Sequence, residues 1–101
     1  MRLRITLASG DLRQSLGFFS AEIGLVGEEL TVEDILKNVG GRNGRTLADI
    51  VITDGMVSPR YAIFLDGQNI ETLQGLKTHV KGGGKIVVMD VIARIAGGLR
   101  S

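Results

Sequence analysis

Two consecutive glycines, Gly97 and Gly98, are the residues whose type and position most clearly suggest chemistry. They follow the last apolar segment of the chain, so we expect no packing role for them. A backbone without Cβ atoms can enter a channel too narrow for other residues. The segment from Arg94 to Gly98 can extend over about 17 Å. It can therefore reach into the active site of another protein.

The rest of the chain offers few groups for catalysis. Its 101 residues include no cysteine and one histidine, His79. These counts exclude disulfides, cysteine nucleophiles and Cys/His zinc sites, and leave only one base for a Ser-His pair. The 12 Lys+Arg and 11 Asp+Glu give a formal net charge of +1, and aromatic residues make up 4%. This balance argues against direct nucleic-acid binding, and we expect no metal or cofactor; His79 is expected to be structural or exposed.

A glycine-rich turn, residues 81–85, superficially resembles an anion-binding nest. A P-loop requires Gly-x-x-x-x-Gly-Lys-Ser/Thr. Because Ile86 follows Lys85, the hydroxyl is missing, and nucleotide binding is not expected.

The N-terminal segment predicts a hairpin. In residues 2–8 apolar and polar side chains alternate, which is typical of a strand with one buried face. Residues 9–11 read as a turn. Residues 17–26 are expected to form the partner strand.

The clearest helix is expected to begin at Thr31, whose side chain can accept from the amide of Asp34 in a capping box. Four apolar residues then share one helical face: Val32, Ile35, Leu36 and Val39. Gly40-Gly41 is expected to end this helix with a left-handed cap. Thr46 can begin a second short helix, although residues 50–52 fit a strand equally well.

Two further strands are expected in the second half. Residues 61–65 predict an interior strand that enters a tight turn, and a helical turn or loop follows over residues 73–80. Residues 86–92 predict a central strand that can be buried on both faces. The order of elements indicates an α+β fold, with a mixed sheet wrapped on one main helix.

Three segments of the chain resemble the ubiquitin-like β-grasp family, which includes the small subunit of molybdopterin synthase, the thiamine sulfur carrier and the small archaeal modifiers. Tyr61–Ile70 is similar to the family's third strand and turn. Leu76–Val88 is similar to the lead into its last strand, and Ile95–Gly98 to its Val-Ala-Gly-Gly tail. The resemblance covers nearly the whole chain and implies a domain of residues 1–93 with a tail of residues 94–101.

The resemblance implies that an activating enzyme uses ATP to form an acyl-adenylate at Gly98. Sulfide or a persulfide then gives a thiocarboxylate, or a target lysine attacks to form an isopeptide bond. The chain would thus be a substrate and carrier, not an enzyme. Gly97 and Gly98 would carry the acyl group, and the activating enzyme would recognise Arg94 and Ala96. A chance Gly-Gly pair, and a solvated charge at Arg94, are the alternatives.

The sequence departs from the family pattern in two places. The acidic turn before the last strand is replaced by Gly82-Gly83-Gly84 between two lysines. Leu99-Arg100-Ser101 follows the second glycine. A processing protease would therefore have to remove residues 99–101.

Two sets of surface residues are candidate partner contacts. Family members dock partners on the open face of the sheet, where Phe64, Val87 and Met89 can form an apolar patch unless they belong to the core. The lysines can accept conjugates or simply carry surface charge: Lys37, Lys77, Lys81 and Lys85.

Three functions remain open from sequence. The first is a modifier matured after Gly98 and attached to lysines of target proteins. The second is a sulfur carrier for molybdopterin, thiamine or tRNA thiolation, which would serve a sulfur-acceptor enzyme. The third is a non-covalent binding module with an unprocessed tail. The sequence predicts neither a secretory signal nor a membrane span, and we expect a cytoplasmic protein without membrane contact.

Overall fold

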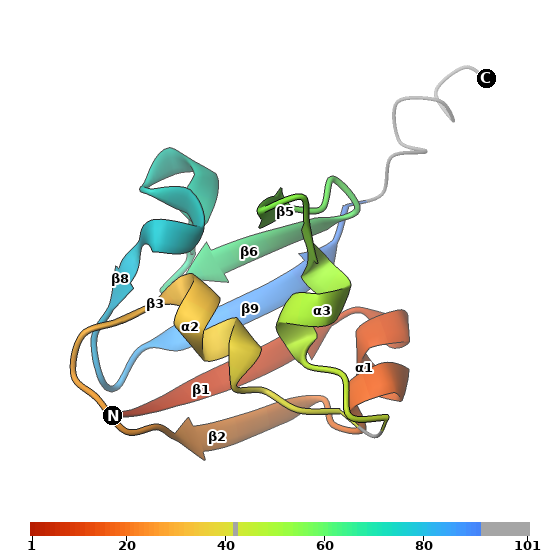
Figure 1. Cartoon of the computed structure of the whole chain (residues 1–101), viewed down its shortest axis with the longest axis horizontal. Coiled ribbons are helices and arrows are strands. Elements are labelled where there is room, and N and C mark those ends of the chain that lie inside the picture. The colour runs from red at the N-terminus through yellow and green to blue at the C-terminus, as the bar shows by residue number, and fades with distance from the viewer. Residues whose placement is uncertain (42, 92–101) are drawn as a thin grey trace.

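A five-stranded sheet with strand order β2-β1-β9-β6-β7 forms the body of the molecule (Figure 1). The computed structural model describes residues 1–41 and 43–91. β1 and β9 are parallel, and the other neighbours are antiparallel. The predicted mixed sheet, the antiparallel pairing of its first two strands and the central place of the last strand are therefore confirmed. The strands are β1 (Arg2–Ala8), β2 (Ser20–Gly24), β6 (Tyr61–Leu65), β7 (Gln68–Asn69) and β9 (Lys85–Asp90).

Two short helices, α2 (Val32–Lys37) and α3 (Leu47–Val51), cover one face of this sheet (Figure 1). Each begins with a capping box, in which a threonine hydroxyl and a carboxylate satisfy one another's backbone amides. Thr31 pairs with Asp34 in α2, and Thr46 pairs with Asp49 in α3. Both predicted helix starts are confirmed. Residues 50–52, which fitted a helix and a strand equally well, contain parts of both, because α3 ends at Val51 and β4 (Ile52–Thr53) follows.

The remaining elements are short. β4 pairs with β5 (Met56–Val57), and β3 (Leu30–Thr31) pairs with β8 (His79–Val80). Two 3-10 turns, η1 (Ile70–Thr72) and η2 (Gly75–Lys77), connect β7 to β8.

The core lies between the sheet and the helices. The alternate residues of β1 point into it, as predicted, and α2 supplies the opposing side chains. The fully buried residues include Ile5 and Leu7 of β1, Ile35 and Leu36 of α2, Leu47 and Val51 of α3, and Ile86 and Val88 of β9.

The predicted turn at residues 9–11 is wrong, because a helix, α1 (Gly10–Leu16), follows β1 directly. Ser9 is its N-cap and accepts a hydrogen bond from the amide of Leu12 at 3.2 Å. Leu12 and Leu16, one helical turn apart, are both buried. The second strand accordingly begins at Ser20 rather than residue 17.

The predicted end of the main helix is also wrong. α2 ends at Lys37, and its cap is Asn38 with φ −101°, not a left-handed glycine. Gly40 instead forms a β-bridge with Thr46, and the amide of Gly41 donates to the carbonyl of Arg45 at 2.7 Å. These glycines therefore shape the connection to α3.

β9 is buried on one face only, which corrects the expectation for residues 86–92. Ile86 and Val88 are buried, whereas Val87 and Met89 are half-buried. The helices cover only the first of these faces (Figure 1), and Ile92 lies outside the described residues.

None of the helices in residues 1–41 and 43–91 has the length and apolar character needed to cross a membrane.

Candidate functional site

The glycine tail and its neighbours lie outside the described residues, which end at Val91. This holds for Arg94, Ala96, Gly97 and Gly98, and for the predicted boundary at residue 93. The structure does define the point where this segment begins. β9, the middle strand of the sheet, ends at Asp90, and the amide of Val91 donates to the carbonyl of Arg60 at 2.8 Å. The centre of the sheet therefore leads directly into the tail sequence.

The predicted patch residues share one face of the sheet. Phe64 and Val87 are register partners on β6 and β9, and Ala62 is the partner of Met89. Their strand neighbours Ile63 and Val88 point the other way, into the core. Phe64, Val87 and Met89 are half-buried and lie together on the face opposite α2 and α3. We call this the open face; a partner-binding role for the patch stays a prediction.

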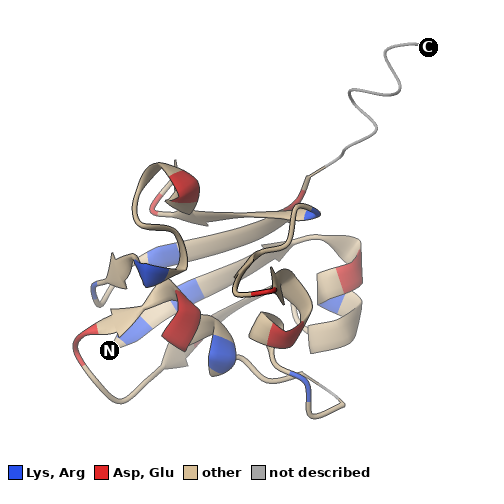
Figure 2. Cartoon of the chain, turned by 45° about the horizontal axis from the view of Figure 1, so that its top comes forward, with Lys and Arg blue, Asp and Glu red and all other residues tan. Residues whose placement is uncertain are grey.

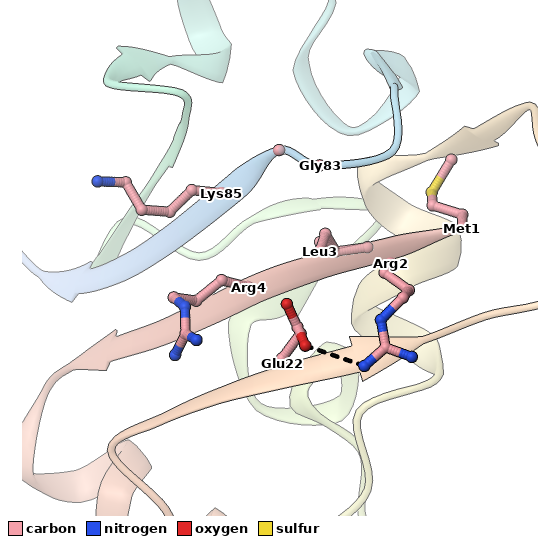
Figure 3. A pocket seen from close by; sticks show the side chains of 8 residues that line it. Met1, Arg2, Leu3, Arg4, Glu22, Gly83 and Lys85 are labelled. Carbon is pink, nitrogen blue, oxygen red and sulfur yellow. Dashed lines mark hydrogen bonds and ion pairs between the residues drawn. The ribbon is translucent and has the colours of Figure 1, made fainter.

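The other end of the open face is basic. Lys85 on β9, Arg4 on β1 and Glu22 on β2 form one row, because Arg4 is the register partner of both other residues. Arg2 lies two residues from Arg4 on β1, and its guanidinium contacts Glu22 Oε1 at 2.9 Å (Figure 3). That hydrogen bond and the charges of Arg2 and Arg4 lower the pKa of Glu22.

A shallow, open depression of about 600 Å³ lies over this row. The charged side chains that line it are those of Arg2, Arg4, Lys85 and Glu22 (Figure 3). Our sequence predictions included Lys85 only as a conjugation site and missed the other three. The alternation of residues 2–8 could have identified the arginines, because it places Arg2 and Arg4 on the face away from the core.

The predicted acceptor lysines are all exposed, but their surroundings differ. Lys37 and Lys77 both pair with Glu33, at 3.4 and 3.3 Å. The Lys77 hydrogen bond, followed by the charge of Lys37, lowers the pKa of Glu33. Lys81 and Lys85 form no ion pair with any residue in the described part of the chain. Figure 2 shows acidic and basic residues dispersed over the ribbon.

The turn at residues 81–85 uses its amides internally. The amide of Gly83 donates to the carbonyl of Arg2 at 2.7 Å, and that of Gly84 donates to the carbonyl of Lys81 at 3.3 Å. The amide of Lys85 donates to Asp66 Oδ1 at 2.9 Å. These donors are therefore not directed at an external phosphate, in agreement with the missing P-loop pattern.

Conventional catalytic groups do not gather in the described structure. His79 is exposed on β8. Among residues 1–41 and 43–91, no three His, Asp or Glu side chains are grouped so that they could hold a metal ion. The arrangement that remains is a body with an open sheet face and a central strand leading to two glycines.

Known proteins resemble this chain in sequence and in fold. No family model matches it. A protein of Archaeoglobus fulgidus described as a candidate sulfur carrier is 32% identical over 66 residues, 65% of this chain and 75% of the relative. The structure of SAMP1 from Haloferax volcanii matches with a TM-score of 0.70 over 92% of this chain and 98% of that one, at 19% identity. A chain of the BexX/CysO complex of Amycolatopsis orientalis gives a TM-score of 0.71 over 90% of this chain and 97% of that one, at 15% identity.

Proposed function

Because the chain belongs to the ubiquitin-like β-grasp family of sulfur carriers and small protein modifiers, we propose that it carries an activated acyl group on Gly98. Its proposed principal role is sulfur transfer. The sequence relative, described as a candidate sulfur carrier, is the single observation that supports this role most strongly. Because of this relative, sulfur transfer becomes the first candidate, whereas the sequence alone placed conjugation to lysines first.

The proposed chemistry takes place on the chain and is performed by other proteins. A protease hydrolyses the peptide bond between Gly98 and Leu99 and frees the Gly98 carboxylate. An activating enzyme then joins this carboxylate to ATP, which gives an acyl-adenylate and releases pyrophosphate. Sulfide attacks the acyl carbon, AMP leaves, and a thiocarboxylate remains for a sulfur-acceptor enzyme.

The need for activation follows from the carboxylate itself. Its carbon is electron-rich and its oxygen is a poor leaving group, whereas AMP leaves readily. Two glycines before the reacting carbon keep the backbone slender enough for the activating enzyme's channel. Arg94 and Ala96 lie just before them and are proposed to be recognised by that enzyme.

Intact-mass analysis tests the sulfur-carrier role. A chain ending at Gly98 is incubated with an activating enzyme from the same organism, ATP and sulfide. We expect a mass gain equal to the exchange of one oxygen for one sulfur, and no gain for the full chain. Gly98→Val should abolish the gain. Gly40→Ala is the control, since a Cβ there meets nothing within 4 Å. An unchanged mass despite adenylation would contradict sulfur transfer.

Conjugation to lysines is a second candidate, supported by the resemblance of Leu99-Arg100-Ser101, after the two glycines, to the removable extension of ubiquitin precursors. It requires the same cleavage after Gly98 as sulfur transfer does. Trypsin cuts after Arg94, so a conjugate should leave residues 95–98 on the target lysine. The same remnant is expected if one copy of the chain is attached to a lysine of another copy, at Lys37, Lys77, Lys81 or Lys85. Mass spectrometry of proteins isolated with the tagged chain tests this; absence of the remnant under every growth condition would contradict conjugation.

A further inference from the structure

The basic end of the open face, formed by Arg2, Arg4 and Lys85, has a charge arrangement that the fold does not require. Lys85 and Arg4 are register partners on the parallel strands β9 and β1, so they project from the same face of the sheet. Like charges opposite one another on neighbouring strands destabilise a sheet. In Figure 3 the side chains of Arg4 and Lys85 run in diverging directions from β1 and β9. This conflict is consistent with a surface shaped by a partner.

The protein supplies little negative charge to balance these cations. The side chains that line the depression include three cations and one carboxylate, Glu22, in a chain whose formal net charge is only +1. Glu22 is held by Arg2 at 2.9 Å, and within the described residues the Arg4 guanidinium donates only to the neutral Ser20 hydroxyl, at 3.2 Å. A second carboxylate, that of Asp66, accepts from the backbone amide of Lys85 through Oδ1, but it forms no ion pair with the Lys85 ammonium. In the described structure the Lys85 ammonium forms no ion pair.

We propose that the basic end of the open face docks an acidic, extended segment of a partner protein. A carboxylate bound between Arg4 and Lys85 would contact both cations once their flexible side chains turn toward it, and would relieve their repulsion. Val87 lies two residues after Lys85 on β9 and projects from the same face. Phe64 on β6 is the register partner of Val87. Two residues of strand span about 6.6 Å, which is also the spacing of alternate side chains in an extended peptide. The segment therefore has an acidic residue and an apolar residue at alternate positions.

The next row of the surface favours a protein over a nucleic acid. A nucleic acid needs a dense basic face that tracks its phosphates, but the row next to Arg4 and Lys85 is uncharged, with Thr6 on β1 and the apolar Val87 and Phe64 on β9 and β6. This docking does not depend on the activation of Gly98, so either proposal can fail without the other.

Amide chemical shifts of the ¹⁵N-labelled protein, titrated at low salt, test the proposal. The probe is a synthetic peptide that presents glutamate and leucine alternately on one face, and its counterpart has lysine in place of glutamate. We expect shifts confined to β1, β9 and β6 with the acidic peptide and none with the basic one. The double variant R4Q/K85Q should bind roughly tenfold more weakly, as expected for the loss of two exposed ion pairs.

The matched control is K37Q/K77Q, which removes two lysine charges elsewhere and should leave the affinity unchanged. Equal weakening by both double variants would show general attraction to a cationic protein and overturn the proposal. Shifts scattered over the molecule, or unchanged binding by R4Q/K85Q, would overturn it too. The proposal would also be overturned if single-stranded RNA or inorganic phosphate shifted the amides of β1, β9 and β6 at a lower concentration than the acidic peptide does. Thermal unfolding of each variant verifies that it is folded.

Discussion

Asp34 illustrates how single polar residues define the helices of this small fold. Its carboxylate accepts from the amide of Thr31 at 3.0 Å, while the Thr31 hydroxyl accepts from the amide of Asp34 at 3.2 Å. The hydrogen bond from the Thr31 amide, followed by that from its side chain, lowers the pKa of Asp34 below its ordinary value of 3.8. The capping box is therefore an acid-sensitive contact as well as a signal for the start of α2.

Lowering the pH should weaken the capping box of α2 in the wild type, and this loss should be absent from an Asp34→Asn variant. Because the pKa of Asp34 is lower in the folded chain, its stabilising contribution is complete above 3.8 and is lost as the pH falls through the folded pKa. The wild type should therefore lose more stability than the variant on acidification. The difference between their free energies of unfolding should become smaller as the pH falls. Urea unfolding at a series of pH values measures this; a difference that does not change with pH would contradict the account.

Lys85 should show opposite effects on stability and on binding. Neutralising it in Lys85→Gln removes the repulsion with Arg4, so we expect a small increase in the urea midpoint, larger at low ionic strength. The same variant should bind the acidic peptide more weakly. Lys81→Gln is a suitable control, since Lys81 is exposed but outside the row. A loss of stability in Lys85→Gln would show that Lys85 supports the fold instead.

At the level of elements, much of the fold could be predicted from local patterns. The alternation in β1 and the threonine caps of α2 and α3 each depend on residues close in sequence, and all were identified correctly. The β-grasp assignment is likewise confirmed by the solved structures. α1 was missed because its Ser-Gly-Asp start has the composition of a turn, and only Leu12 and Leu16 mark its buried side. The role of Gly41 depends on contacts with distant residues, which local patterns do not contain.

Gly41 and Gly40 should respond differently to the same substitution. A Cβ at Gly41 would lie 2.9 Å from the carbonyl oxygen of Ser15 in α1 and 3.2 Å from that of Arg45, whereas at Gly40 it meets nothing within 4 Å. Gly41→Ala should therefore cost about 1–3 kcal/mol, because backbone must move to admit it. Gly40→Ala should change stability little. Equal urea midpoints for the two variants would contradict this packing of the connection against α1.

At the scale of the whole molecule, the two proposals concern different parts of the chain, the open face of the sheet and the glycine tail. The open face has an apolar end and a basic end, and its central strand leads to the glycines that the family resemblance marks as reactive. Sequence placed Phe64, Val87 and Met89 as a possible patch, but alternation alone could not say which face the helices cover. It missed the basic row because Arg4, Glu22 and Lys85 become neighbours only through strand pairing.

The intact mass of the protein isolated from its own cells tests the central proposal most directly. With an affinity tag at the N-terminus, the account predicts a chain that ends at Gly98, part of it with one oxygen exchanged for sulfur. Gly98→Asp should remove the sulfur-containing species, whereas Gly40→Ala should retain it. The account would be contradicted if every molecule kept Leu99–Ser101 and Gly98→Asp left cellular function intact, because the tail would then have no covalent role.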